Sequence, residues 1–74
     1  MDARKIGQRL KELRENRGQS KRFVAKTVGI PYRTYCSYEY SERIPNDENK
    51  IKLAAHFEQT VESIFFAERY HEKK

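Results

Sequence analysis

The stretch SKRFVAKTVGIPYRTYCSYEY, which begins at Ser20, constrains the fold of this chain more than any other segment. Ser20 is a favoured N-cap residue, and the residues after it form an apolar edge at helical spacing, made of Val24, Ala25 and Val28. Gly29 is suited to the left-handed conformation that ends a helix. Pro31 suits the first turn of a following helix, because its missing N–H costs nothing there. The stretch therefore predicts two short helices, over residues 20–28 and 31–39, that meet at a sharp turn.

Two helices joined by a short turn that contains glycine have the outline of a helix-turn-helix. At about 100° per residue, the second of these helices has two different faces. One is a core-like stripe formed by Thr34, Tyr35 and Tyr38. The other carries phenol, guanidinium and hydroxyl groups but no large aliphatic side chain, and consists of Tyr32, Arg33, Cys36 and Ser37. Because such groups can read base edges or hold phosphates, this second face is a candidate nucleic-acid surface.

The rest of the chain is also helical in its periodicity, and no segment alternates strongly enough to predict a strand. Residues 3–16 carry one apolar stripe, and Gly18 marks the end of that helix. A loop fixed by Pro45 precedes a helix over residues 47–58, whose N-cap is offered by Asn46-Asp47 and whose buried side is Ile51, Leu53, Ala54, Ala55 and Phe57. Thr60 caps a last helix over residues 61–70. The sequence thus predicts an all-α domain of five helices.

Length and charge limit the possible functions. A chain of 74 residues is one domain, here residues 1–70 with a polar tail at 71–74, and its small core would gain from dimerisation. The net charge of +5 is uneven: residues 1–33 hold ten Lys/Arg and three Asp/Glu, whereas residues 34–74 hold six and eight. This asymmetry indicates a polyanion-binding face. A solvated, soluble surface would explain the charge about equally well.

Other classes of function lack their sequence signals. The single cysteine, Cys36, cannot form an internal disulfide, which fits a reducing cytosol. Cys36, His56 and His71 do not have the spacing of a metal site, and no apolar run approaches the roughly 20 residues of a membrane span. No paired carboxylates or nucleophile–base set stands out, and so small a domain has little room for a pocket. We therefore expect no enzyme activity, cofactor, metal, membrane contact or small-molecule ligand.

Several segments together resemble one known family, the Cro and lambda-repressor-like helix-turn-helix family, also called the XRE family of transcriptional regulators. IGQRLKELRENRG is similar to its first helix, and SKRFVAKTVGI to its second helix and turn, with the characteristic Ala25 and Gly29. PYRTYCSYE resembles its recognition helix, which ends in the usual glutamate, here Glu39. RIP and KLAAHFEQTVESIF resemble the loop and the last two helices. The combined spacing extends over nearly the whole chain and is quite specific.

The resemblance implies a compact five-helix, lambda-repressor-like domain that docks on double-stranded DNA, with the third helix in the major groove and the second across the backbone. It implies base-facing positions at Lys21, Tyr32, Arg33 and Ser37, and positions near phosphates at Gln19, Ser20, Tyr40 and Arg43. It also implies a buried ion pair between Arg14 and Glu39, and a cytoplasmic, bacterial or phage-encoded protein. The sequence departs from the family pattern at Ser41, where glycine is usual, and at Tyr32, where glutamine or serine is frequent.

Individual residues keep alternative interpretations. Arg33 can hold a guanine edge with two hydrogen bonds, although a phosphate contact explains it nearly as well. Tyr32 can touch a thymine methyl or a phosphate, or simply pack on its own helix. Tyr35 and Tyr38 fit a core, in which case their hydroxyls need partners. Cys36 fits a small residue near the DNA face better than a redox site.

Two functional hypotheses follow. The first is a DNA-binding regulator, a repressor that acts as a homodimer on a pseudo-palindromic operator. The second is a protein-interaction or antitoxin-like module that keeps the fold but acts through a partner protein. For the homodimer we expect a self-complementary patch on the last helix, formed by Ile64, Phe66 and Tyr70. The competing expectation is a monomer that pairs only on DNA, with Phe66 folded into its own core.

Overall fold

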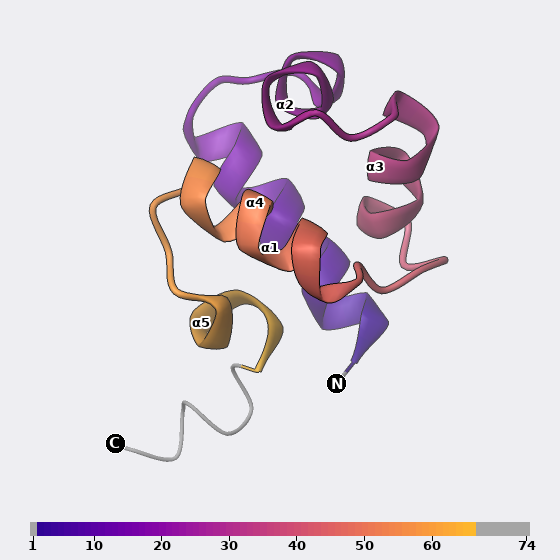
Figure 1. Cartoon of the computed structure of the whole chain (residues 1–74), viewed down its shortest axis with the longest axis vertical. Helices are drawn as coiled ribbons and strands as arrows, with labels where there is room; N and C mark the ends of the chain where they lie inside the picture. The colour runs from indigo at the N-terminus through magenta and orange to yellow at the C-terminus, as the bar shows by residue number, and fades with distance from the viewer. Residues whose placement is uncertain (1, 67–74) are drawn as a thin grey trace.

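Five helices and their connections make up residues 2–66, the part of the chain that a computed structural model describes (Figure 1). The helices are α1 (Ala3–Asn16), α2 (Lys21–Val28), α3 (Tyr32–Glu39), α4 (Asp47–His56) and α5 (Val61–Phe65). No strand occurs in this described part of the chain. The prediction of an all-α, five-helix domain is therefore confirmed.

The helix ends follow from local side-chain chemistry. Three predicted N-caps each accept a hydrogen bond from a backbone N–H in the first turn of their helix, namely Ser20, Asn46 and Thr60. Gly29 ends α2 in the left-handed conformation, with φ 77°. Its N–H donates to the carbonyl groups of Ala25 and Lys26 and so closes the end of α2. The chain then turns sharply into α3. Pro31 is the N-cap of α3 rather than its first helical residue.

Helix α4 differs from its prediction in length and in its buried side. It ends at His56, because Phe57 is its C-cap and Glu58 adopts a left-handed conformation with φ 57°. Leu53, Ala54 and Phe57 are buried as predicted, but Ala55 is exposed and Ile51 keeps 62% of its surface exposed. Lys50 takes the inward position instead. The prediction from apolar composition was therefore wrong for Ile51 and Ala55 and made the buried side of this helix too wide. The predicted part of the last helix beyond residue 66 lies outside the described residues.

The core holds α3 against α1 and α2. Tyr35 and Tyr38 are buried within it, beside apolar residues from all the other helices. Each tyrosine hydroxyl has a partner: Tyr35 donates to Glu39, and Tyr38 accepts from the Asn49 side chain at 2.9 Å. Helix α1 approaches α3 especially closely at Gly7, where an added Cβ would lie 2.6 Å from the carbonyl oxygen of Glu39. The position of α3 is therefore fixed by direct contact with the backbone of α1.

Candidate nucleic-acid interface

A buried ion pair anchors the C-terminal end of α3. Arg14 of α1 donates from Nε to Glu39 Oε2 at 2.7 Å and from Nη2 to Glu39 Oε1 at 3.1 Å. Its third nitrogen, Nη1, donates to the carbonyl oxygen of Gln19 at 2.9 Å, just before α2. The side chains are 10% and 2% exposed for Arg14 and Glu39, respectively. One guanidinium therefore ties together α1, the start of α2 and the end of α3.

Tyr35 completes this cluster from within α3. Its hydroxyl donates to Glu39 Oε2 at 2.5 Å, one helical turn away. Burial, together with the neighbouring carboxylate, raises the pKa of Tyr35, so its hydroxyl stays protonated and remains a donor. The hydrogen bond to Glu39 likewise raises the pKa of Arg14 and keeps it charged. Both oxygens of the Glu39 carboxylate are thus satisfied in the interior.

The opposite side of α3 faces outward in two rows. At 3.6 residues per turn, Tyr32, Cys36 and Tyr40 follow one another along the helix and its C-cap, and Arg33 and Ser37 form a neighbouring row. Tyr32, Arg33 and Tyr40 are exposed, and the other two are partly buried. This is the face that the periodicity predicts to be polar.

Residues at the start of α2 contact the two ends of the first row. Lys21 Nζ donates to the Tyr40 hydroxyl at 2.9 Å and lies 4.9 Å from the centre of its ring. This hydrogen bond raises the pKa of Lys21, so the ammonium stays charged. Arg22 lies over the Tyr32 ring, with its guanidinium carbon 4.2 Å from the centroid. Two cations from α2 are therefore held beside α3 by aromatic side chains.

The second row borders a polar hollow at the surface, lined by Arg33, Thr34, Ser37, Glu42 and Arg43. The Ser37 hydroxyl donates to the carbonyl oxygen of Thr34 at 2.6 Å, and its oxygen can still accept. Neither the Arg33 side chain nor the Arg43 side chain makes a hydrogen bond or ion pair with another residue in the range 2–66, although Glu42 shares the hollow. Two guanidinium groups are thus left with unused donors on the exposed face of α3.

Gln19 and Ser20 lie together just before α2, and both already have partners. Ser20 Oγ accepts from the N–H of Phe23 at 3.0 Å. Gln19 Oε1 lies 2.9 Å from His56 Nε2. Burial and the charge of Arg17 lower the pKa of His56, which favours the neutral ring. With His56 as the donor, the Gln19 amide nitrogen remains available to an acceptor.

Two features of this surface were not anticipated from the sequence. One is the contact between Arg22 and Tyr32, which depends on how α2 crosses α3 and leaves no signal in either segment alone. The other is a hollow beside the Arg14–Glu39 pair. Lys11 of α1 lines this hollow together with Lys21 and Tyr40. The basic charge of the N-terminal half predicts an anion-binding surface, but it does not indicate these positions.

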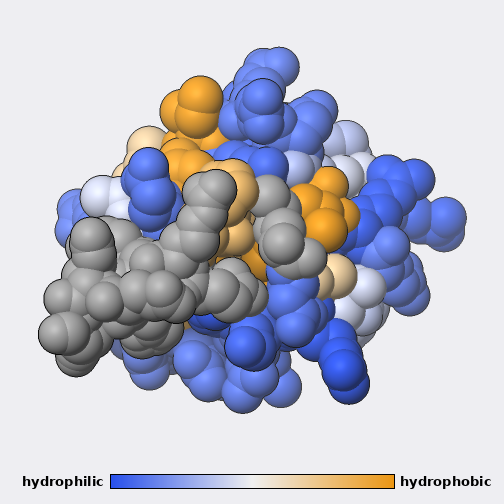
Figure 2. Space-filling view, turned by 90° about the horizontal axis from the view of Figure 1, so that it is seen from below, coloured by the Kyte–Doolittle hydropathy of each residue, from blue (hydrophilic) through white to orange (hydrophobic). Residues whose placement is uncertain are grey.

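Two residues of the expected dimer patch are described by the structure, Ile64 in α5 and Phe66 at the C-cap of that helix. Ile64 is only 1% exposed and belongs to the core, which corrects its assignment to a dimer surface: a side chain buried within its own protomer has no area left for a partner. Phe66 is partly buried against that core, and Lys50 Nζ lies 5.3 Å from the centre of its ring. Tyr70 lies outside the described residues. On the face shown in Figure 2, apolar residues (orange) reach the surface beside hydrophilic ones (blue).

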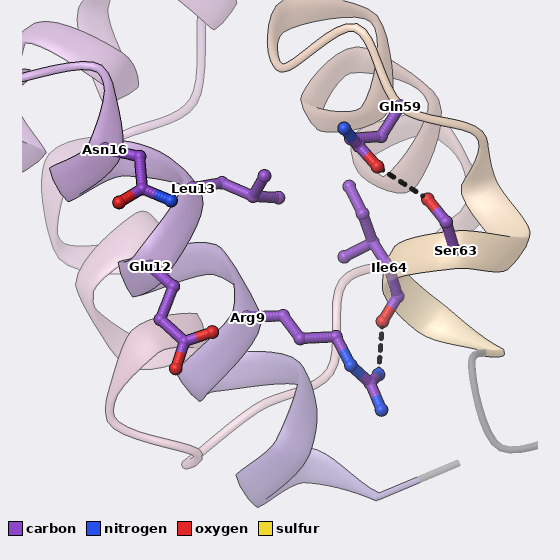
Figure 3. Close-up of a pocket in the computed structure, with 7 residues that line it drawn as sticks. All are labelled: Arg9, Glu12, Leu13, Asn16, Gln59, Ser63 and Ile64. Carbon is purple, nitrogen blue, oxygen red and sulfur yellow. Dashed lines mark hydrogen bonds between the residues drawn. The ribbon is translucent and has the colours of Figure 1, made fainter. Parts of the chain in front are cut away.

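A further hollow lies between α1 and α5 (Figure 3). Arg9 crosses it and donates from Nη1 to the carbonyl oxygen of Ile64 at 2.5 Å, which satisfies a carbonyl at the end of α5. Among residues 2–66, no group of three or more His, Cys, Asp or Glu side chains could hold a metal ion. Within the same range, no helix has the length and apolar character needed to cross a membrane.

Comparison with known proteins supplies the family. A helix-turn-helix family model matches residues 10–64, a region that begins within α1 and includes the other helices almost to the end of α5. No curated protein and no solved structure matches the chain. The matched region covers most of the sequence and includes the α2–turn–α3 unit and both partners of the Arg14–Glu39 pair. The chain therefore belongs to the Cro/lambda-repressor-like (XRE) helix-turn-helix family of DNA-binding transcription regulators.

Proposed function

We propose that this protein is a repressor that binds a specific double-stranded DNA operator through the outward face of α3. The observation that carries the proposal is the pair of guanidinium groups, Arg33 and Arg43, which flank Ser37 and whose donors no residue from 2 to 66 uses. A cation that is exposed and unpaired requires no internal ion pair to break before it binds an anion. The family consists of DNA-binding regulators and not of enzymes.

The roles differ along this face. Arg33 is near the start of α3, the part of a recognition helix that contacts base edges, so we assign to it the bidentate reading of a guanine. Ser37, one turn later, offers its oxygen to a base donor, and Tyr32 lies beside them.

Arg43, in the loop after α3, and Lys21, held by Tyr40, contact phosphates. We also place Gln19 and Ser20 near backbone phosphates of the DNA, where the Gln19 amide nitrogen is an available donor.

Replacing Arg33 with alanine is expected to cost about 1–3 kcal/mol of binding free energy on the operator and much less on random DNA. The matched control is Arg43→Ala, which removes the same group from the same hollow. Arg43→Ala should weaken binding to both duplexes alike. Because one phosphate contact is lost, the slope of log K against log salt should become shallower by about one. The measurement is a fluorescence anisotropy titration over a salt series, with an operator selected from a random duplex pool.

An equal loss of affinity on operator and random DNA in Arg33→Ala would remove its readout role. A wild-type protein that bound no duplex, at low salt or high, would contradict DNA binding itself. It would favour the protein-interaction or antitoxin-like alternative.

We also propose that the repressor is a homodimer, since one helix-turn-helix unit reads a half-site and a two-fold dimer reads a pseudo-palindrome. With Ile64 buried, Phe66 is the described residue of the expected patch that retains exposed surface, and Tyr70 is its proposed neighbour. A location near α5 would leave α3 free, because α3 packs on α1 and α2.

Analytical ultracentrifugation is expected to show a wild-type dimer at micromolar concentrations and a monomer for Phe66→Glu. The matched control is Ile51→Glu, which places the same charge on an exposed apolar position of α4 and should leave the dimer intact. A wild type that stays monomeric at high micromolar concentration would refute the homodimer. Dissociation by Ile51→Glu alone would move the interface to α4.

A further inference from the structure

We propose that Arg22 is a phosphate-binding residue and that Tyr32 is the platform that positions it. This inference rests on the proposed function and changes the role of Tyr32. In this proposal the Tyr32 ring positions the Arg22 side chain, and DNA binding does not require a contact from the Tyr32 hydroxyl group. Arg22 was not among the residues that the sequence indicated.

The first step is the geometry of the contact. Arg22 belongs to the first turn of α2, and Tyr32 is the first residue of α3. The guanidinium carbon lies 4.2 Å from the ring centroid, a distance at which a cation is attracted by the ring. The attraction to the ring uses none of the oxygen or nitrogen acceptors of the chain, and no residue from 2 to 66 accepts a hydrogen bond from the Arg22 side chain. The contact with Tyr32 therefore restricts the Arg22 side chain and leaves its N–H donors available.

The second step is the absence of a competing anion. No carboxylate pairs with Arg22 among the residues that the structure describes, and the first turn of α2 contains no acidic residue. The preceding residue, Lys21, adds a second positive charge, and the N-terminal end of a helix itself favours anions. Tyr32 is 38% exposed, so the pair lies at the surface. A phosphate oxygen is the acceptor that this arrangement fits.

The third step is position on the proposed DNA face. Lys21 reaches Tyr40 at one end of the outward row of α3, and Arg22 reaches Tyr32 at the other. The two tyrosines are eight residues apart, which corresponds to about 12 Å along a helix. Adjacent cations of α2 thus diverge toward both ends of the recognition helix. With that helix in the major groove, they would contact the backbone at two separate points. A pre-positioned side chain also loses less conformational freedom on binding.

The test uses the full chain, the selected operator and a scrambled duplex of the same length, with affinities measured over a salt series. Arg22→Ala is expected to weaken binding about tenfold on both duplexes and to make the salt slope shallower by about one. Tyr32→Phe keeps the ring and should bind within about twofold of wild type, because the face of Phe also attracts a cation. Tyr32→Leu removes the ring and should lose most of the affinity that Arg22→Ala loses. The double variant Arg22→Ala/Tyr32→Leu should bind no more weakly than Arg22→Ala, because the two residues act as one unit.

Several results would overturn the inference. Binding by Tyr32→Phe as weak as that by Tyr32→Leu would show that the hydroxyl group contacts DNA. A loss in Arg22→Ala on the operator alone would indicate a guanine contact rather than a phosphate contact. Losses that add in the double variant would show that the residues act independently. Wild-type affinity in Arg22→Ala would refute this inference alone, whereas a wild type that binds neither duplex would refute the proposed function. Thermal melting of each variant separates lost folding from lost binding.

Discussion

Replacing Glu39 with glutamine is expected to lower the free energy of unfolding by about 3–5 kcal/mol, because it leaves Arg14 as a buried charge without its counter-ion. The carboxylate accepts two hydrogen bonds from Arg14 and one from Tyr35 while being 2% exposed. A neutral amide keeps the shape of the side chain, but it turns one acceptor into a donor that faces other donors. Since a domain of this size has little stability in reserve, much of the protein should unfold near body temperature.

The matched control is Glu42→Gln, the same change at an exposed glutamate with no ion pair among residues 2–66. It should change the free energy of unfolding by no more than about 0.5 kcal/mol. Urea denaturation followed by circular dichroism measures both variants. Equal midpoints for Glu39→Gln and wild type would show that the cluster does not anchor α3.

Replacing Gly7 with alanine is expected to destabilise the protein by about 1–3 kcal/mol, the usual cost of overpacking. The new Cβ would lie 2.6 Å from the Glu39 carbonyl oxygen, 2.8 Å from that of Tyr38 and 2.9 Å from Ser41 Oγ. Two of these three atoms belong to the backbone, so α3 must move away from α1. Without this contact alanine would stabilise the helix by about 0.5–1 kcal/mol, so the sign of the effect is diagnostic.

Gln8→Ala is the control for Gly7→Ala, because it makes an alanine at the next, exposed position of the same helix. It should leave the melting temperature nearly unchanged. Since Gly7→Ala displaces α3, its affinity for the operator should also fall when it is measured well below the melting temperature. A Gly7→Ala variant as stable as wild type would mean that α1 and α3 are not in backbone contact.

The sequence predicted those parts of the structure that depend on short-range chemistry. Ser20, Asn46 and Thr60 cap helices because their side chains reach an N–H three residues away. Gly29 takes the left-handed conformation that permits the turn into α3. The two faces of α3 followed from its periodicity alone. The pairing of Arg14 with Glu39 is a contact across 25 positions, and it was expected only through the resemblance to a family.

The remaining differences come from packing between helices. The composition of α4 gave no means of deciding that Lys50 would lie inward and Ile51 outward, since that depends on where α2 and α5 contact it. Ile64 was placed on a surface because its neighbours are aromatic, but α5 directs it into the core. The contact between Arg22 and Tyr32 depends on the crossing of α2 and α3. Each of these needs a three-dimensional arrangement that spacing along the chain does not contain.

The central claim is that the outward face of α3, with the start of α2, is the DNA-binding surface. The most direct test is to map amide chemical-shift changes in isotopically labelled protein as the selected operator is added. We expect the largest changes at Lys21, Arg33, Ser37 and Arg43, and small changes around the α1–α5 hollow at Arg9, Gln59 and Ser63. Changes confined to that hollow, with the α3 signals unmoved, would contradict the claim.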